Sequence, residues 1–154
     1  MERKPVLINW GAHWCFYCMA LKATVFTRSD FIAQTANVVA VDLDGDTPEG
    51  QAANVEFNVI GYPTLAIFKA DKTEIARVSG GMDLEQYAGT LARVLEDERP
   101  ISEVLAAAVK PDVAAISKED CRRLAYHGWD LEAEDDAAAP EKASEIAFAA
   151  DRCL

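Results

Sequence analysis

Cys15 and Cys18 are two cysteines with two residues between them, and their type and spacing suggest chemical reactivity more clearly than any other pair in the sequence. A thiol attacks only as the thiolate anion, so a reactive cysteine needs surroundings that stabilise negative charge. If a helix begins at Cys15, its unpaired backbone N–H groups and its dipole supply that stabilisation. Cys18 then lies one turn further along the same face. The spacing therefore predicts an attacking thiol at Cys15 and a resolving thiol at Cys18.

Two other interpretations of this pair are half of a metal site and a plain structural disulfide. A tetrahedral zinc site needs two further ligands at similar local spacing, whereas the remaining histidines and cysteines (His13, Cys121, His127 and Cys153) are scattered single residues. A disulfide that closes so short a ring stabilises little, because the gain grows with loop length. We therefore expect no bound metal, and a redox pair is favoured.

The overall composition limits the classes of protein to which the chain can belong. Its 154 residues are 51% apolar, which suffices for one ordinary domain, or a small domain with an appendage. The net charge of −11 argues against nucleic acid and anionic membrane surfaces as partners. No apolar run approaches the roughly 20 residues that a membrane span needs. The apolar stretch after the basic start, residues 5–8, is also too short for a signal peptide.

Apolar runs and turn residues predict the secondary structure that positions the cysteines. Strands are expected over residues 6–10, 38–43, 64–68 and 74–78, and the last two are close enough to form an antiparallel hairpin. Helices are expected from the cysteines onward, after Thr47-Pro48, and from Asp83 to Leu95. The order is strand, helix, strand, helix, strand, strand, helix.

Past Pro100 the pattern is helical only. One amphipathic helix should run from Ile101 to about residue 109, a second should begin at Ser117, and a third should begin near Pro140. We therefore place a domain over residues 1–99 and a helical C-terminal extension over residues 100–154. Cys121 and Cys153 lie on the apolar sides of separate predicted helices. Packing as small hydrophobic residues is the first expectation for them, and a disulfide in an oxidising compartment is the alternative.

Four segments together resemble the thioredoxin superfamily in motif order and spacing, over about residues 4–97. They are "PVLINWGAHWCFYC", "VVAVDLD", "GYPTLAIF" and "SGGMDLEQY". The layout looks most like the thioredoxin-like C-terminal domain of DsbD-type thiol:disulfide interchange proteins. The resemblance implies an α/β, thioredoxin-like fold, namely a minimal four-stranded mixed sheet with flanking helices, here followed by the helical extension.

The resemblance also implies a role for each motif residue. Cys15 would be the exposed nucleophile, Cys18 the buried resolving thiol, and Trp14 the indole beside them. Pro63 would follow a cis bond and face the disulfide, leaving backbone groups of Tyr62 free to pair with an extended substrate. No cofactor is implied beyond the Cys15–Cys18 disulfide.

Some positions depart from the family pattern. Asn9 occupies the place of a buried aspartate that handles the proton of the second cysteine, and an amide cannot take up a proton at neutral pH. Lys22 replaces a glutamate; it would stabilise a thiolate if it pointed inward, but a solvated helix lysine is the simpler interpretation. His13 either tunes Cys15 or is an exposed loop residue. The linking residues, Phe16 and Tyr17, are not the Gly-Pro of thioredoxin, so no redox potential can be carried over.

We predict a thiol–disulfide oxidoreductase that exchanges disulfides with protein substrates, as a reductase or an isomerase-type interchange protein. Its partners would be protein thiols and disulfides, with a membrane or soluble thiol donor upstream. The bacterial periplasm is favoured over the cytoplasm, which stays open. A thiol-based zinc or copper carrier and a redox-inert binding module are the alternatives. The direction of electron flow, the specific partner, the role of the extension and the oligomeric state are not readable from the sequence.

Overall fold

The computed structural model describes residues 4–80, 89, 92–111, 115–129 and 139–153. The elements up to residue 80 are β1 (Val6–Gly11), α1 (Phe16–Thr24), α2 (Ser29–Thr35), β2 (Val39–Asp44), α3 (Pro48–Glu56), β3 (Thr64–Phe68) and β4 (Glu74–Ser79). The expected strands and their order are confirmed, each to within one residue. The helix expected over residues 83–95 lies largely outside the described residues, although residues 92–96 are helical.

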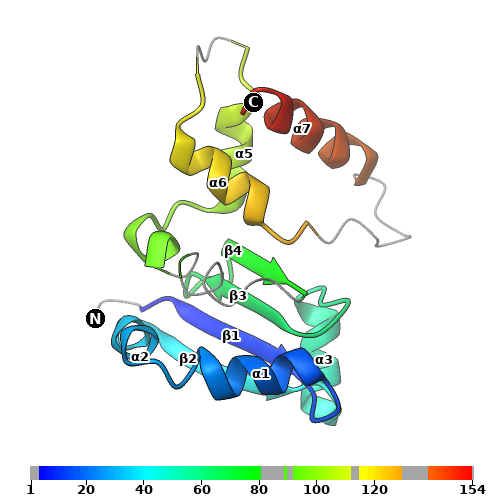
Figure 1. Ribbon diagram of the computed structural model, residues 1–154. Coiled ribbons are helices and arrows are strands. Elements are labelled where there is room, and N and C mark those ends of the chain that lie inside the picture. The colour runs from blue at the N-terminus through cyan, green and yellow to red at the C-terminus, as the bar shows by residue number, and fades with distance from the viewer. Residues whose placement is uncertain (1–3, 81–88, 90–91, 112–114, 130–138, 154) are drawn as a thin grey trace.

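The four strands form one mixed sheet in the order β2-β1-β3-β4. β1 runs parallel to β2, with Asn9 opposite Asp42, and antiparallel to β3. The hairpin of β3 and β4 is antiparallel, as predicted. This is the four-stranded mixed sheet with flanking helices that the resemblance implied (Figure 1).

Alternation along β1 divides the core between the two faces of the sheet. On one face, Leu7 packs with Leu21 of α1 and Phe31 of α2. On the other face, Ile8 and Trp10 pack with Phe57 at the end of α3 and with other apolar side chains. Because successive residues of a strand point to opposite faces, Asn9 and Gly11 share the α1 side with Leu7. That parity places two small or polar residues of β1 directly beneath the helix that carries Cys18.

The chain after Pro100 forms the helices α5 (Ile101–Ala108), α6 (Lys118–Tyr126) and α7 (Ala139–Asp151). They lie beyond the β4 edge of the sheet (Figure 1) and share a separate apolar cluster, which includes Val104, Leu124 and Ala149. Ser117 caps α6 by accepting a hydrogen bond from the backbone of Asp120 at 3.0 Å, as its position in the sequence predicted.

Cys121 of α6 and Cys153 just after α7 form a disulfide, with their Cα atoms 5.6 Å apart. The first expectation, that they pack as separate small hydrophobic residues, is therefore wrong. The physical reason is that α6 and α7 pack side by side around one apolar cluster, which brings their apolar faces together. The alternative expectation, a bridge between them, is the one that the structure contains.

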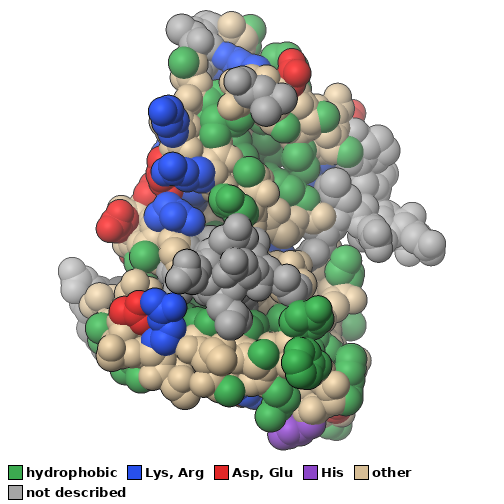
Figure 2. Space-filling view, viewed as in Figure 1, with side chains coloured by type: hydrophobic (Ala, Val, Ile, Leu, Met, Phe, Trp, Pro, Cys, Tyr) green, Lys and Arg blue, Asp and Glu red, His purple; other side chains and the backbone are tan. Residues whose placement is uncertain are grey.

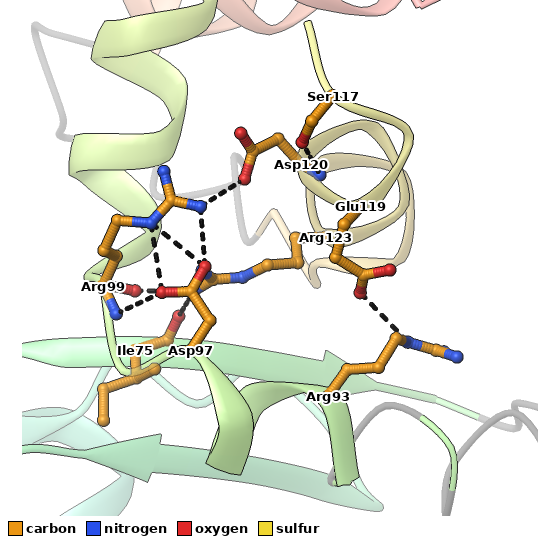
Figure 3. A network of polar contacts seen from close by, with 8 residues as sticks. All are labelled: Ile75, Arg93, Asp97, Arg99, Ser117, Glu119, Asp120 and Arg123. Carbon is orange, nitrogen blue, oxygen red and sulfur yellow. Dashed lines mark hydrogen bonds and ion pairs between the residues drawn. The ribbon is translucent and has the colours of Figure 1, made fainter.

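Arg123 joins the helical extension to the sheet. Its buried guanidinium pairs with Asp97 at 2.7 Å and donates to the carbonyl oxygens of Ile75 in β4 and of Arg99, at 3.2 and 2.6 Å. Asp97 also pairs with Arg99, which in turn reaches Asp120 at 2.6 Å. Figure 3 shows this network between α6 and β4. A buried cation is stable only when it is paired and hydrogen-bonded, so the network fixes where α6 docks.

His127 forms a second link between α6 and β4. Its Nδ1 accepts the backbone N–H of Arg77 at 3.1 Å, while Nε2 lies 3.4 Å from a carboxylate oxygen of Glu74. Burial, helped by the positive charges of Arg77, Lys142 and Arg123, lowers the pKa of His127 to about 3. The imidazole is therefore neutral in the folded protein throughout the ordinary pH range.

We expect the stability of the protein to fall as the pH drops from 7 to 5. In the unfolded chain His127 has an ordinary pKa near 6.5. Below that pH the unfolded state therefore binds a proton at His127, whereas the folded state does not. The difference amounts to roughly 2 kcal/mol of unfolding free energy at pH 5. Urea unfolding of the His127→Gln variant, which keeps a polar side chain but cannot titrate, should show a shallower pH dependence. Parallel pH profiles for the two proteins would contradict this role for His127.

Candidate active site

The two motif cysteines form a disulfide at the N-terminus of α1. Cys15 is the N-cap residue, and its Sγ accepts the backbone N–H of Cys18 at 3.2 Å. This is the helix-start position that the spacing predicted. Cys15 keeps 6% of its surface exposed and Cys18 2%, so the expected contrast between an exposed and a covered sulfur is small. Both residues pack with Ala12 and against Tyr62, which accounts for the low exposure of Cys15.

Tyr62 lies beside the disulfide and is joined to Pro63 by a cis peptide bond, the bond that the resemblance implied. The Tyr62 ring packs against the cysteines and lies 6.1 Å from the Trp14 ring, centroid to centroid. A Cβ at Gly45 would overlap the Tyr62 hydroxyl, at 1.9 Å. Glycine is therefore required there to let the tyrosine lie over the turn that follows β2.

Three aspartates at alternate positions, in β2 and in the turn after it, contact residues that lie close to Cys15 and Cys18 in the sequence or the fold. Asp46 accepts the indole N–H of Trp14 at 3.1 Å, and Asp44 lies 3.4 Å from the exposed imidazole of His13. Asp42 contacts two further residues, Asn9 and Lys22, described next. Their alternation in the sequence is the signal that they share one face of the chain.

Asn9 and Lys22 meet at Asp42 rather than at the cysteines. Asn9 Nδ2 donates to Asp42 Oδ1 at 2.7 Å, and Lys22 Nζ lies 2.6 Å from Asp42 Oδ2. Lys22 is therefore neither a freely solvated lysine nor a direct thiolate partner, because the carboxylate of β2 holds it. Asn9 is 5% exposed, consistent with its expected place in the core. Asp42 is the residue of this cluster that sequence reasoning missed.

Exposed aromatic side chains surround the start of α1. Trp14 keeps 71% of its surface exposed and Phe16 79%, and Tyr17 and Met19 are also exposed. Figure 2 shows hydrophobic side chains gathered at the lower right of the molecule, where α1 begins in Figure 1. Large exposed apolar groups next to a reactive disulfide form a surface on which another polypeptide can dock.

Among the described residues, no group of three or more His, Cys, Asp or Glu side chains is placed to hold a metal ion. The cysteine sulfurs are instead bonded to each other. A disulfide at a helix N-terminus can be attacked by a thiolate, and its reduced form can attack other disulfides. The fold and this site define a thiol–disulfide oxidoreductase domain.

Comparison with known proteins agrees with that class. A thioredoxin-like domain family matches residues 1–95, and the chain belongs to this thioredoxin-like family. Thiol:disulfide interchange protein DsbD of Yersinia pestis is 33% identical over 90 residues, which cover 56% of this chain and 15% of that protein. DsbD of Haemophilus influenzae is 30% identical over 93 residues, covering 58% and 16% respectively. The chain thus spans only a small part of the length of these relatives.

A thioredoxin from Thermus thermophilus has the same fold in its solution structure. It is 25% identical, with a TM-score of 0.53, and the match covers 59% of this chain and 73% of that one. The expected family is therefore confirmed.

None of the described helices is both long enough and apolar enough to cross a membrane.

Proposed function

We propose that this chain reduces or rearranges disulfides in other proteins, with Cys15 as the attacking thiol and Cys18 as the resolving thiol. The observation that carries the proposal is the Cys15–Cys18 disulfide at the start of α1, where Cys15 Sγ accepts a backbone N–H. The same N–H and the helix dipole would stabilise the Cys15 thiolate after reduction.

The reaction consists of two exchanges. The Cys15 thiolate attacks one sulfur of a substrate disulfide; that bond breaks, a mixed disulfide forms, and the departing substrate sulfur takes up a proton. Cys18 then loses its proton and attacks the sulfur of Cys15, which releases the second substrate thiol and leaves the Cys15–Cys18 disulfide. The substrate gains two electrons, and a thiol donor, either soluble or in a membrane, must return two electrons to the pair.

The surface around the cysteines supports protein substrates. Trp14, Phe16 and Tyr17 would contact apolar side chains on either side of the substrate cysteine, and Tyr62 would offer its backbone to an extended segment. His13, paired with Asp44, lies at the edge of this surface and would tune substrate contacts. We propose no cofactor beyond the disulfide.

The equilibrium potential of the Cys15–Cys18 couple tests the direction of electron flow. The protein is equilibrated in a series of dithiothreitol or glutathione redox buffers and its free thiols are then alkylated. Mass spectrometry gives the fraction of reduced protein at each buffer potential. A value near −270 mV, typical of thioredoxin, is expected for a reductase, whereas a value near −120 mV, typical of DsbA, would overturn reduction in favour of oxidation. Cys121→Ser/Cys153→Ser protein gives the potential of the first couple alone.

We also propose that the chain divides at Arg99-Pro100 into an exchange domain, residues 1–99, and a helical extension, residues 100–154. The separate apolar cluster of α5, α6 and α7 supports this division, as does the end of the family match at residue 95. An extracytoplasmic location, such as the bacterial periplasm, is supported by the Cys121–Cys153 disulfide, because such bonds persist in oxidising compartments. Cell fractionation with an antibody against the chain tests the location.

A further inference from the structure

A row of polar groups lies beneath α1, on the sheet face that this helix covers. Asn9 of β1 is the middle member: it donates to Asp42 of β2 and borders, with Cys18 of α1, the space beside Gly11. A Cβ built on Gly11 would be 3.5 Å from Cys18 Sγ and 3.8 Å from Asn9 Nδ2. The sulfur and the amide therefore face the same small space, which exists because residue 11 has no side chain.

The orientation of the Asn9 amide follows from its partner. An ionised carboxylate only accepts hydrogen bonds, so the Nδ2 group must point to Asp42, as observed at 2.7 Å. Nδ2 carries a second hydrogen, and Asn9 Oδ1 is buried and accepts no hydrogen bond from the described part of the chain. The amide thus has unused donor and acceptor capacity next to a sulfur that must both lose and regain a proton.

Lys22 closes the row on the solvent side. It lies one helical turn after Cys18 and pairs with Asp42 at 2.6 Å. About half of the Asp42 side chain and 40% of the Lys22 side chain are exposed, so this end of the row is open to water. Charge on Asp42 and Lys22 can therefore act on Cys18 across the buried Asn9 amide, while the Asp42–Lys22 end of the row exchanges protons with solvent.

We propose that Asp42 and Lys22 are positioning residues that set the proton affinity of the Cys18 thiol, acting across the Asn9 amide. The inference rests on the exchange chemistry proposed above and concerns its second step. In that step Cys18 gives its proton to solvent, its thiolate attacks the Cys15 sulfur of the mixed disulfide, and the bond from Cys15 to the substrate breaks. The departing substrate sulfur takes a proton from solvent.

The two charges act on Cys18 in opposite directions, and this opposition makes the proposal testable. Removal of the carboxylate leaves the lysine unbalanced, and a nearby cation favours the thiolate. Removal of the lysine leaves the carboxylate unbalanced, and a nearby anion disfavours the thiolate. Among the described residues, the other ionisable groups near Cys18 are Cys15 at the N-cap of its own helix, Tyr62, and the pair formed by His13 of the preceding loop and Asp44 at the end of β2. Cys15 is replaced by serine in every protein of the titration, and the other groups are left unchanged.

The experiment uses the full chain with Cys15→Ser, so that Cys18 is the free thiol of the motif while Cys121 and Cys153 stay bonded. The ultraviolet absorbance of the thiolate against pH gives the titration of Cys18. We expect Asp42→Asn to move the titration to lower pH by about half a unit and Lys22→Gln to move it up by a similar amount, since partial exposure screens both charges. In the Asp42→Asn/Lys22→Gln double variant the titration of Cys18 should return close to that of the Cys15→Ser parent. Lys22→Arg, which keeps the positive charge, should also titrate like that parent.

Kinetics in the intact pair provide the second readout. The rate at which Cys18 displaces an aromatic thiol from Cys15 should rise about twofold in Asp42→Asn and fall about twofold in Lys22→Gln, at a pH where the thiolate fraction is small. The change in that fraction is partly offset by an opposite change in the nucleophilicity of the thiolate. Glu56→Gln and Lys72→Gln are matched controls. They remove the same charges from an exposed pair that joins the end of α3 to the β3–β4 turn, near the end of the sheet where Phe68 lies opposite Val6. These controls should leave both readouts unchanged.

The outcomes separate this inference from the proposed function. Shifts of the same sign in Asp42→Asn and Lys22→Gln, no shift in either, or equal shifts in the controls would overturn the inference while exchange at Cys15 continued. Failure of Cys15 to form any mixed disulfide in the parent protein would instead overturn the proposed function itself.

Discussion

Replacing Cys15 by serine is expected to lower disulfide exchange at least about 10³-fold, to the level of the uncatalysed reaction. A serine hydroxyl is not ionised at neutral pH, so the backbone N–H that Cys15 Sγ accepts would have no thiolate to stabilise. The measurement is the rate of insulin disulfide reduction with dithiothreitol as the electron source.

Two further variants control this experiment. Cys18→Ala should keep the first attack and accumulate mixed disulfides with substrate, which appear as higher bands on non-reducing gels. Cys121→Ser/Cys153→Ser should keep the exchange rate, because these residues lie in the helical extension. Full activity in Cys15→Ser, or equal trapping by Cys15→Ala and Cys18→Ala, would contradict the assigned roles.

Replacing Arg123 by alanine is expected to lower the free energy of unfolding by about 3–5 kcal/mol, the usual effect of removing one partner from a buried ion pair. The change would leave the Ile75 and Arg99 carbonyl oxygens without their donor and would remove one partner of Asp97. Hydrogen bonds from Arg99, together with the positive charges, hold the pKa of Asp97 well below its usual range, so its carboxylate stays charged in the variant.

Arg122 is the matched control for Arg123. It is the preceding residue of the same helix, but its side chain is 58% exposed and lies 3.6 Å from Glu119. Arg122→Ala should therefore change the unfolding free energy by no more than about 0.5 kcal/mol. Urea unfolding measures both variants, and hydrogen exchange in β4 and α6 shows whether the junction has opened. Equal losses in the two variants would mean that the Arg123 network does not hold the extension in place.

The order of the strands and helices could be predicted because the residues that start and end each element lie within it or next to it in the sequence. The apolar run of β1, the threonine and proline that start α3, and the serine that caps α6 each act within a few residues. The cysteine spacing likewise placed Cys15 at a helix start. The cis bond before Pro63 could be expected only through the resemblance to a family.

Contacts between residues distant in sequence could not be predicted in the same way. Asn9 and Asp42 are 33 residues apart and meet because β1 and β2 pair in one particular register. Arg123 reaches Ile75 across 48 residues, which depends on how α6 docks on β4. Shifting either arrangement by one residue would leave the local pattern unchanged, so local pattern carries no information about these partners.

The covalent link between Cys121 and Cys153 closes a ring around 31 intervening positions, since the two lie 32 residues apart. A protease that cuts the backbone once within this ring leaves both fragments attached to each other. Nicked protein would therefore migrate as a single intact band on an electrophoresis gel without reductant, and would release its C-terminal peptide once reductant is added. Samples of this protein should be checked for clipping under both conditions.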